Sequence, residues 1–216
     1  SFEHRNFTLT DTITGTPGRR IPTTHKENVL SIGGQLIKSQ GKTLHYNVLG
    51  EIAMIGEDAG QFSVEGQGDL NFRLFNDTVR LEANAYIKNL NPTFYYRHFH
   101  SKHYWWDNDL SKIMRTRIEG KLSIDRWRTQ LKAGVENITN ANDVVSYKND
   151  MAVRQHSGNI QVFSASLRQD FKLGILHLDN EITYQKTSNE TVLPLPELVL
   201  YHDLYIRFGL AKKVLS

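Results

Sequence analysis

Apolar and polar residues alternate along most of the chain. In residues 61–75, QFSVEGQGDLNFRLF, every even position is apolar or glycine and every odd position is polar except the terminal Phe75. A helix does not separate these two sets, whereas a β-strand places them on opposite faces. The alternation recurs in 78–90, 112–124, 127–138, 175–186 and 199–210, and more weakly in 28–38, 43–55 and 158–171. The pattern predicts nine strands, and residues 3–12 are a candidate for a tenth.

The predicted strands are long and no helices separate them. Several run to a dozen residues or more, whereas a strand of a soluble protein usually has ~5–6 residues. A tilted strand needs ~9–11 residues to cross a lipid bilayer. The absence of helical periodicity between the strands argues against βαβ folds and most of the enzymes built on them.

The connections between strands fall into two kinds that alternate along the chain. Tight turns are expected at 38–43, 75–78, 123–127 and 171–176, and longer loops at 13–27, 91–111, 139–157 and 187–198; the short GEDAG at 56–60 belongs to the second set by its order. Short turns at one end and long loops at the other are typical of outer-membrane barrels. We therefore expect an all-β, antiparallel up-and-down transmembrane β-barrel in which residues 1–216 form a single domain and the long loops are extracellular.

A soluble antiparallel β-sandwich is the alternative fold. It has the same alternation, with the apolar face as its core. Strand length, the density of charge on the polar face and the aromatic residues at the ends of the apolar face favour the barrel, because aromatic girdles mark both membrane interfaces. These aromatic residues are Phe75, Trp127, Phe171 and Phe208.

In a barrel the polar face lines the lumen. The predicted pore-lining residues are Glu65, Asp69, Arg73, Arg80, Glu82, Lys88, Arg115, Arg117, Glu119, Lys121, Arg128, Lys132, Glu136, Asp179, Glu181, Asp203 and Arg207. Residues 112–136 are mostly basic on this face and residues 175–207 mostly acidic, which predicts a transverse field that favours dipolar solutes. The spacing of Asp179 and Glu181 also suits acid–base chemistry, but a pore-lining ladder explains it better.

Two stretches also resemble a known family. They are DAGQFSVEGQGDLNFRLFNDTVRLEANAYIKNLNPTFYYRHFHSKHYWWDNDL, followed by RTRIEGKLSI, and later NEITYQKTSNETVLPLPELVLYHDLYIRFGLAKKVLS. Their strand-and-loop texture is similar to that of the putative porins of the Bacteroidota, over roughly residues 45–216. The resemblance implies a bacterial outer-membrane location and a pore, and it supplies no catalytic residues. Members of this family are longer than this chain, which implies that the chain is one portion of a larger barrel.

Residues 94–110, FYYRHFHSKHYWWDNDL, combine seven aromatic residues with three histidines. The tight turns on either side place this stretch at the long-loop end. An interfacial girdle with a self-packed loop explains the aromatic residues, and stacking of sugars or other substrates at the pore mouth is a second interpretation. His98, His100 and His103 leave a metal site as a third.

Composition narrows the chemistry. The chain has no cysteine, which excludes disulfides and thiolate sites, and it has no apolar run long enough for a transmembrane helix. The net charge of +3 is spread along the chain without basic blocks, so nucleic acid is not an expected partner. No phosphate-binding glycine loop, HExxH or GxSxG motif is present. We expect no enzyme activity, no cofactor and no metal site.

The sequence therefore predicts an outer-membrane porin that gives small polar solutes a passive path through a charged lumen. Outer-membrane lipid and those solutes are the expected partners, with other envelope proteins as further candidates. The alternatives are a plugged barrel that acts as an envelope docking or assembly partner, and a soluble carbohydrate-binding sandwich. The final RFGLAKKVLS continues past a short turn into another apolar run, so we expect a larger barrel of about 14 or more strands.

Overall fold

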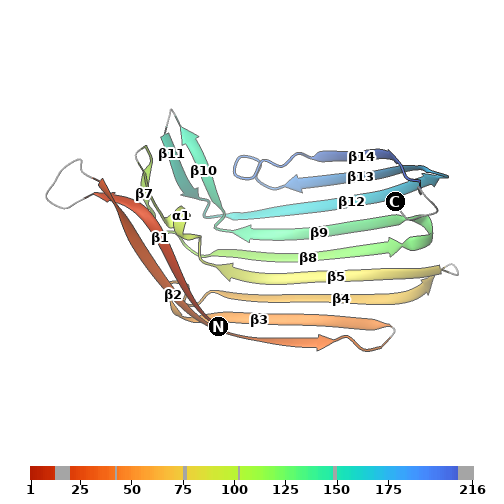
Figure 1. Cartoon of the computed structure of the whole chain (residues 1–216), viewed down its shortest axis with the longest axis horizontal. Coiled ribbons are helices and arrows are strands. Elements are labelled where there is room, and N and C mark those ends of the chain that lie inside the picture. The colour runs from red at the N-terminus through yellow and green to blue at the C-terminus, as the bar shows by residue number, and fades with distance from the viewer. Residues whose placement is uncertain (13–19, 42, 75–76, 102, 148–149, 209–216) are drawn as a thin grey trace.

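The computed structural model describes residues 1–12, 20–41, 43–74, 77–101, 103–147 and 150–208. It contains one ten-stranded antiparallel sheet in which each strand pairs with the next strand of the sheet along the chain (Figure 1). Its strands, in order, are β1 Phe2–Thr12, β2 Arg20–Lys38, β3 Leu44–Gly56, β4 Phe62–Leu74, β5 Asp77–Leu90, β8 Ile113–Ile124, β9 Thr129–Thr139, β12 Asn159–Leu173, β13 Leu176–Thr187 and β14 Leu198–Ile206. The all-β fold and the antiparallel meander predicted from the alternation are confirmed.

The cross-strand register places the two residue sets on two faces. On one face a row of leucines and one isoleucine crosses eight strands at one level, because each member pairs directly with the next. The row consists of Leu44, Leu70, Leu81, Leu122, Leu131, Leu167, Ile182 and Leu200. The apolar face is open to its surroundings: Ile118 is 68% exposed and Leu204 is 64% exposed.

The short and long connections lie at opposite ends of the sheet (Figure 1). One end has the tight turns, of which the turn after β8 includes the 3-10 helix η1, Asp125–Trp127. The other end has short elements within two of the long connections: α1 Phe94–Arg97, β6 His98–His100 and β7 Trp105–Asp107 after β5, and the hairpin of β10 Asn142–Tyr147 with β11 Asp150–Gln155 after β9. The sequence pattern did not predict these elements.

Three predicted boundaries differ from the structure. Residues 20–27 of the loop expected at 13–27 belong to β2, which begins at Arg20 and pairs with β1. The strand expected from residue 127 begins at Thr129, since Trp127 belongs to η1. The strand expected at 199–210 ends at Ile206. Phe75 and residues 209–216, on which part of the girdle and the larger-barrel expectation rest, lie outside the described residues.

The first strand lies largely beyond the main sheet. β1 pairs only with Arg20–Leu30 of β2, while β3 pairs with β2 from Val29 to Lys38. A register shift between Leu30 and Ser31 marks the point where β2 bends, and Figure 1 shows the β1–β2 hairpin inclined away from the sheet. Such irregularities bend a strand and increase its twist. The hairpin therefore projects at the long-loop end.

The sheet is not closed within the described residues. β1 and β14 are the two ends of the strand order and do not pair with each other. No second large sheet covers either face in this part of the chain, since the other two sheets have two strands each. A β-sandwich needs two packed sheets, so this architecture does not match the sandwich alternative.

Few apolar side chains are buried, and they lie mostly toward the long-loop end or at the turns. In the described residues they are Leu9, Val29, Ala53, Val79, Phe94, Val153 and Ile160. A soluble protein of this length buries a contiguous core, so an exposed apolar face of this extent is unusual for one. No helix in the described part of the chain is long and apolar enough to cross a membrane.

Candidate functional site

The predicted pore-lining residues share the polar face of the sheet. The register shows this directly, because charged residues of one strand pair with polar residues of the next: Glu65 with Tyr86, Lys88 with Arg115, and Arg117 with Glu136. Asp69, Glu82, Lys121 and Lys132 form one such row. Arg73 and Arg80 lie toward the tight turns of the same face, and Asp179, Glu181 and Asp203 extend it onto β13 and β14.

Two predicted members of this set lie at strand ends. Arg128 is in the turn after η1, with a left-handed backbone conformation (φ 50°), and not on a strand. The turn needs this conformation to lead from the 3-10 helix into β9. Arg207 follows the last residue of β14, and its backbone N–H donates to the carbonyl of Ile175. Both arginines are therefore at the tight-turn end of the polar face.

Glu136 is the centre of an ion-pair cluster on β5, β8 and β9. Its side chain is buried and accepts from the Tyr86 hydroxyl at 2.8 Å and from Nε of Arg115 at 2.7 Å. Nη1 of Arg117 lies 3.5 Å from the second oxygen. Arg117 also donates to Glu119, which in turn lies 3.1 Å from Nζ of Lys132. On this part of the face three cations therefore share two carboxylates.

Ion pairs continue across the rest of the polar face. Lys88 lies 2.7 Å from Glu65, and Lys121 lies 3.0 Å from Glu82. On the acidic side, Arg168 of β12 donates to Asp170 at 3.2 Å and lies 3.7 Å from Asp179. The sequence-based set of pore-lining residues did not include Arg168. It lies on this face nonetheless, because residues two apart on a strand share a face and Arg168 stands between Ser166 and Asp170.

The connection after β5 forms the aromatic cluster of the long-loop end. Phe94 of α1 is buried and stacks on Phe7 of β1 with ring centroids 4.0 Å apart. Phe99 stacks on Trp106 across the β6–β7 hairpin at 4.7 Å. Mutual packing therefore accounts for much of this stretch, as in the self-packed loop interpretation. Tyr95 and Trp105 also contact neighbouring rings, although both residues are partly exposed.

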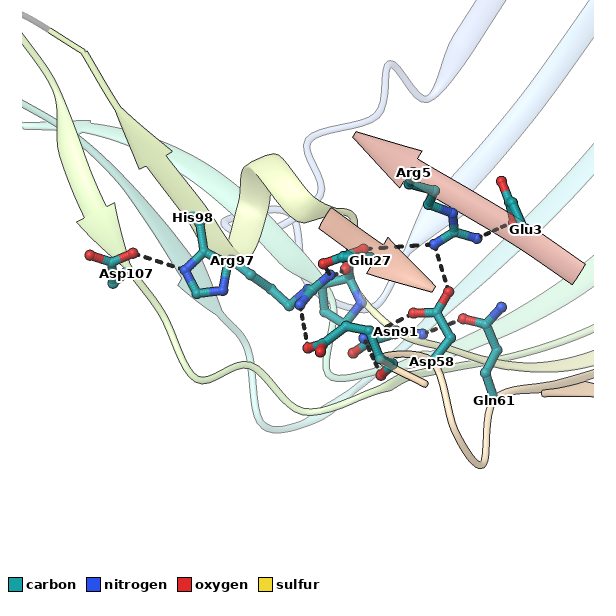
Figure 2. A network of polar contacts seen from close by, with 11 residues as sticks. Glu3, Arg5, Glu27, Asp58, Gln61, Asn91, Arg97, His98 and Asp107 are labelled. Carbon is teal, nitrogen blue, oxygen red and sulfur yellow. Dashed lines mark hydrogen bonds and ion pairs between the residues drawn. The ribbon is translucent and has the colours of Figure 1, made fainter. Parts of the chain in front are cut away.

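Arg97, the last residue of α1, holds this connection against two other parts of the chain (Figure 2). Nη2 donates to Glu27 of β2 at 2.6 Å, and Nη1 donates to Glu57, just after β3, at 2.7 Å. Nε donates to the carbonyl of Pro92 at 3.0 Å. Only 7% of the Arg97 side chain and 8% of the Glu27 side chain are exposed. Removing one partner of such a buried pair strongly destabilises the fold, because the other charge is left buried and uncompensated.

A second arginine joins β1 to the same region. Arg5 donates to the buried Asp58 at 2.7 Å and to Glu3 at 2.6 Å (Figure 2). The other oxygen of Asp58 accepts from Nδ2 of Asn91 at 3.1 Å. The hydrogen bond from Arg5 lowers the pKa of the exposed Glu3, and the bond to Glu3 raises the pKa of Arg5 against its partial burial. We call Arg97, Glu27, Glu57, Arg5 and Asp58 the mouth cluster.

A chain of imidazole–carboxylate pairs extends from the mouth cluster. Asp11 pairs with His25 at 2.8 Å and with His100, and Asp107 pairs with both His98 and His100 at 2.8 Å. Burial raises the pKa of Asp11 and of Asp107, but the hydrogen bonds from the histidines outweigh burial and the net pKa of each lies below its usual value. Two of the three histidines considered as metal ligands, His98 and His100, thus pair with carboxylates, and the described residues contain no group of three potential ligands that converges on a metal ion.

The mouth cluster was not predicted from the sequence. Its members come from distant parts of the chain: Glu27 and Arg97 are 70 positions apart, and no spacing rule joins them. The only signal in the sequence was the pair of carboxylates in GEDAG, because so short a connection holds its side chains in a fixed place. The bend of β2 and the turn of α1 bring these residues together.

Comparisons with known proteins agree with this architecture. A family model described as "Putative porin" matches residues 1–216, the whole chain. Neither the curated proteins nor the solved structures provide a match.

Proposed function

The chain belongs to the putative porin family, and we propose that it is a passive channel for small polar solutes in a bacterial outer membrane, namely that of a member of the Bacteroidota. In this proposal the ten-stranded sheet is part of a closed barrel, the apolar face contacts lipid, and the polar face lines water. The long-loop end is extracellular. The protein performs no catalysis and needs no cofactor.

The exposed apolar face is the observation that carries the proposal. The leucine row spans eight strands and is open on its outer side, and further apolar residues such as Ile118 and Leu204 lie on either side of it. In water, exposure of this surface is unfavourable by ~25 cal/mol per Å². In a bilayer the same surface contacts lipid acyl chains and not water, so this cost is absent and a membrane location is favoured.

The open edges of the sheet support a larger ring. Backbone groups at membrane depth need hydrogen-bond partners, so a membrane sheet is stable only when it closes on itself. In the described residues the outer edges of β14 and of Ile32–Lys38 in β2 have no partner strand. We propose that further strands complete a barrel of about 14 or more strands, a size that leaves an aqueous channel.

The ion pairs on the polar face support a water-filled lumen. Most of these side chains are partly exposed, so water solvates their charges and the pairs contribute little to stability, as expected on a wet surface. A face with this charge density is unsuitable as a packed core, because each buried charge needs a close partner. Small polar solutes are the class that such a lumen admits.

The second candidate function is a plugged barrel that docks other envelope proteins. The connection after β5 favours it, because the mouth cluster fixes this segment at the long-loop end with buried ion pairs. A fixed segment narrows a channel, and a sufficiently large one closes it.

Solute flux separates the two functions. The purified protein is reconstituted into liposomes, and swelling is measured in isotonic arabinose, glucose and a larger oligosaccharide. A porin gives swelling rates above those of protein-free liposomes that decrease with solute size. Rates equal to those of protein-free liposomes for every sugar would favour the plugged barrel.

A further inference from the structure

A cavity of ≈ 490 Å³ lies where the long-loop end meets the polar face. Its walls come from the connection after β5, from the ends of β8, β9 and β12, and from the connection between β13 and β14. Cavities of ~300–1,000 Å³ commonly enclose small molecules, and barrel mouths are one of their usual places. We propose that this cavity binds a small amphipathic carboxylate, an inference that rests on the proposed function in placing the site at the mouth of the solute path.

The wall of the cavity is largely aliphatic. Leu90 and Ile113 pair directly across β5 and β8, one step beyond Lys88 and Arg115 on the same face. The polar face thus becomes apolar at this end. Leu193 and Leu195, from the connection before β14, line the cavity together with them. An apolar body placed here loses contact with water, which favours binding.

Arg115 supplies a cationic group to the same cavity. Its Nε and Nη2 lie 2.7 and 2.6 Å from Oε1 of Glu136, whereas Nη1 has no partner among the described residues. The side chain is 43% exposed. Glu136 already accepts from Tyr86 and lies close to Arg117, so it offers a ligand little acceptor capacity. The site therefore favours a ligand that brings acceptor oxygens.

The local charge favours an anion over a neutral acceptor. The three cations Arg115, Arg117 and Lys132 share the two carboxylates Glu119 and Glu136, which leaves one positive charge unbalanced. Hydrogen bonds between a guanidinium and a carboxylate are stronger than those between neutral groups. A carboxylate head beside Arg115 compensates the remaining charge.

Asn142 gives an independent indication of a bound acceptor. It lines the cavity, and its Nδ2 is buried without a hydrogen-bond partner in the described part of the chain. Its Oδ1 accepts from Nε2 of Gln155 at 3.0 Å, which fixes the orientation of the amide. Buried donors without partners are rare because they lose the hydrogen bond that water provided. A ligand oxygen in the cavity satisfies this donor.

The test uses 4-phenylbutyrate as the probe, with the protein in lipid nanodiscs and binding measured by ligand-observed NMR against empty nanodiscs. We expect saturable binding. Two analogues should bind at least about tenfold more weakly than the probe: 4-phenylbutanamide, which lacks the charge, and butyrate, which lacks the apolar body. The probe itself should bind to the Arg115→Gln variant at least about tenfold more weakly than to the unmodified protein. Arg168→Gln is the matched control, because Arg168 is 45% exposed and lies on the same face away from the cavity.

A second variant, Leu193→Asn, leaves the sheet unchanged and also weakens binding of the probe. Equal binding of the amide and the carboxylate, or equal loss in Arg115→Gln and Arg168→Gln, would overturn the proposal, and so would the absence of saturable binding to the unmodified protein. Sugar-driven liposome swelling keeps this outcome separate from the proposed function. Swelling without probe binding refutes only the carboxylate site, and probe binding without swelling refutes only the open channel.

Discussion

Arg97 and Glu27 form a buried ion pair of 2.6 Å between residues 70 positions apart. The pair joins the end of α1 to the part of β2 that projects beyond the main sheet. Because Arg97 also donates to Glu57 and to the carbonyl of Pro92, one guanidinium fixes three segments at the long-loop end. The geometry of the long-loop end thus depends on a few charged side chains.

Replacement of Arg97 by alanine is expected to release the connection after β5 while the sheet stays folded. The change leaves Glu27 buried without its cation, and breaking a buried pair costs about 3–5 kcal/mol. Hydrogen–deuterium exchange of residues 94–107 measures the effect. Faster exchange confined to this segment and to the β1–β2 hairpin is the expected result.

Arg126→Ala is the control for that variant, because Arg126 is exposed in the turn at the opposite end. Exchange rates in Arg97→Ala that match those of Arg126→Ala would show that the ion pair does not hold the segment.

The imidazole–carboxylate pairs are expected to weaken in acid, which loosens the long-loop end. The folded-state pKa values of Asp11 and Asp107 lie below their usual values, so their contribution to stability is complete above about pH 4 and is lost as the pH falls through the lower folded-state values. Limited proteolysis of the β6–β7 hairpin between pH 7 and pH 3 reports this. Asp107→Asn should be cleaved at pH 7 about as readily as the unmodified protein at pH 3. Cleavage that does not change with pH in either protein would contradict the assignment.

The face assignment gives a direct prediction of stability in lipid. Leu81→Arg places a charge in the leucine row and is expected to reduce the free energy of folding into a bilayer by about 2–4 kcal/mol if the residue lies near the midplane. Asn84→Arg is its matched control, three residues along β5 on the polar face and beside Glu119. Urea titration in lipid vesicles measures both. Equal destabilisation by the two variants would mean that the faces are assigned wrongly.

The predictions from sequence succeeded where a local pattern was sufficient. Alternation of period two determines which face each residue occupies, so the strands of the ten-stranded sheet between Leu44 and Thr187 and the rows of charged residues could be assigned without coordinates. Turn composition separated the two ends of the sheet for the same reason.

What the sequence did not reveal depends on the backbone path. β2 continues through residues 20–27 because β1 provides a hydrogen-bonding partner there, although the polar run TTHKE resembles a loop. The pairing of Glu27 with Arg97 and the cavity beside Arg115 arise from the bend of β2 and from folded connections. Neither leaves a periodic trace in the sequence.

The arginines of β8 are expected to influence ion selectivity. Arg115 and Arg117 both face the proposed lumen, so replacing both by glutamine removes two positive charges from one wall. In a salt gradient across a planar bilayer, the reversal potential should shift toward cation selectivity. An unchanged reversal potential would place these side chains away from the conducting path.

The central claim is that the polar face of this sheet lines the conducting path. The chain has no cysteine, so a single cysteine can be introduced at Asn84 on the polar face or at Leu81 on the apolar face. Channel current in a planar bilayer is then recorded while a charged, membrane-impermeant thiol reagent is added. We expect stepwise reduction of the current for Asn84→Cys and no change for Leu81→Cys. A current that is insensitive to the reagent at Asn84→Cys, or reduced at Leu81→Cys, would contradict the claim.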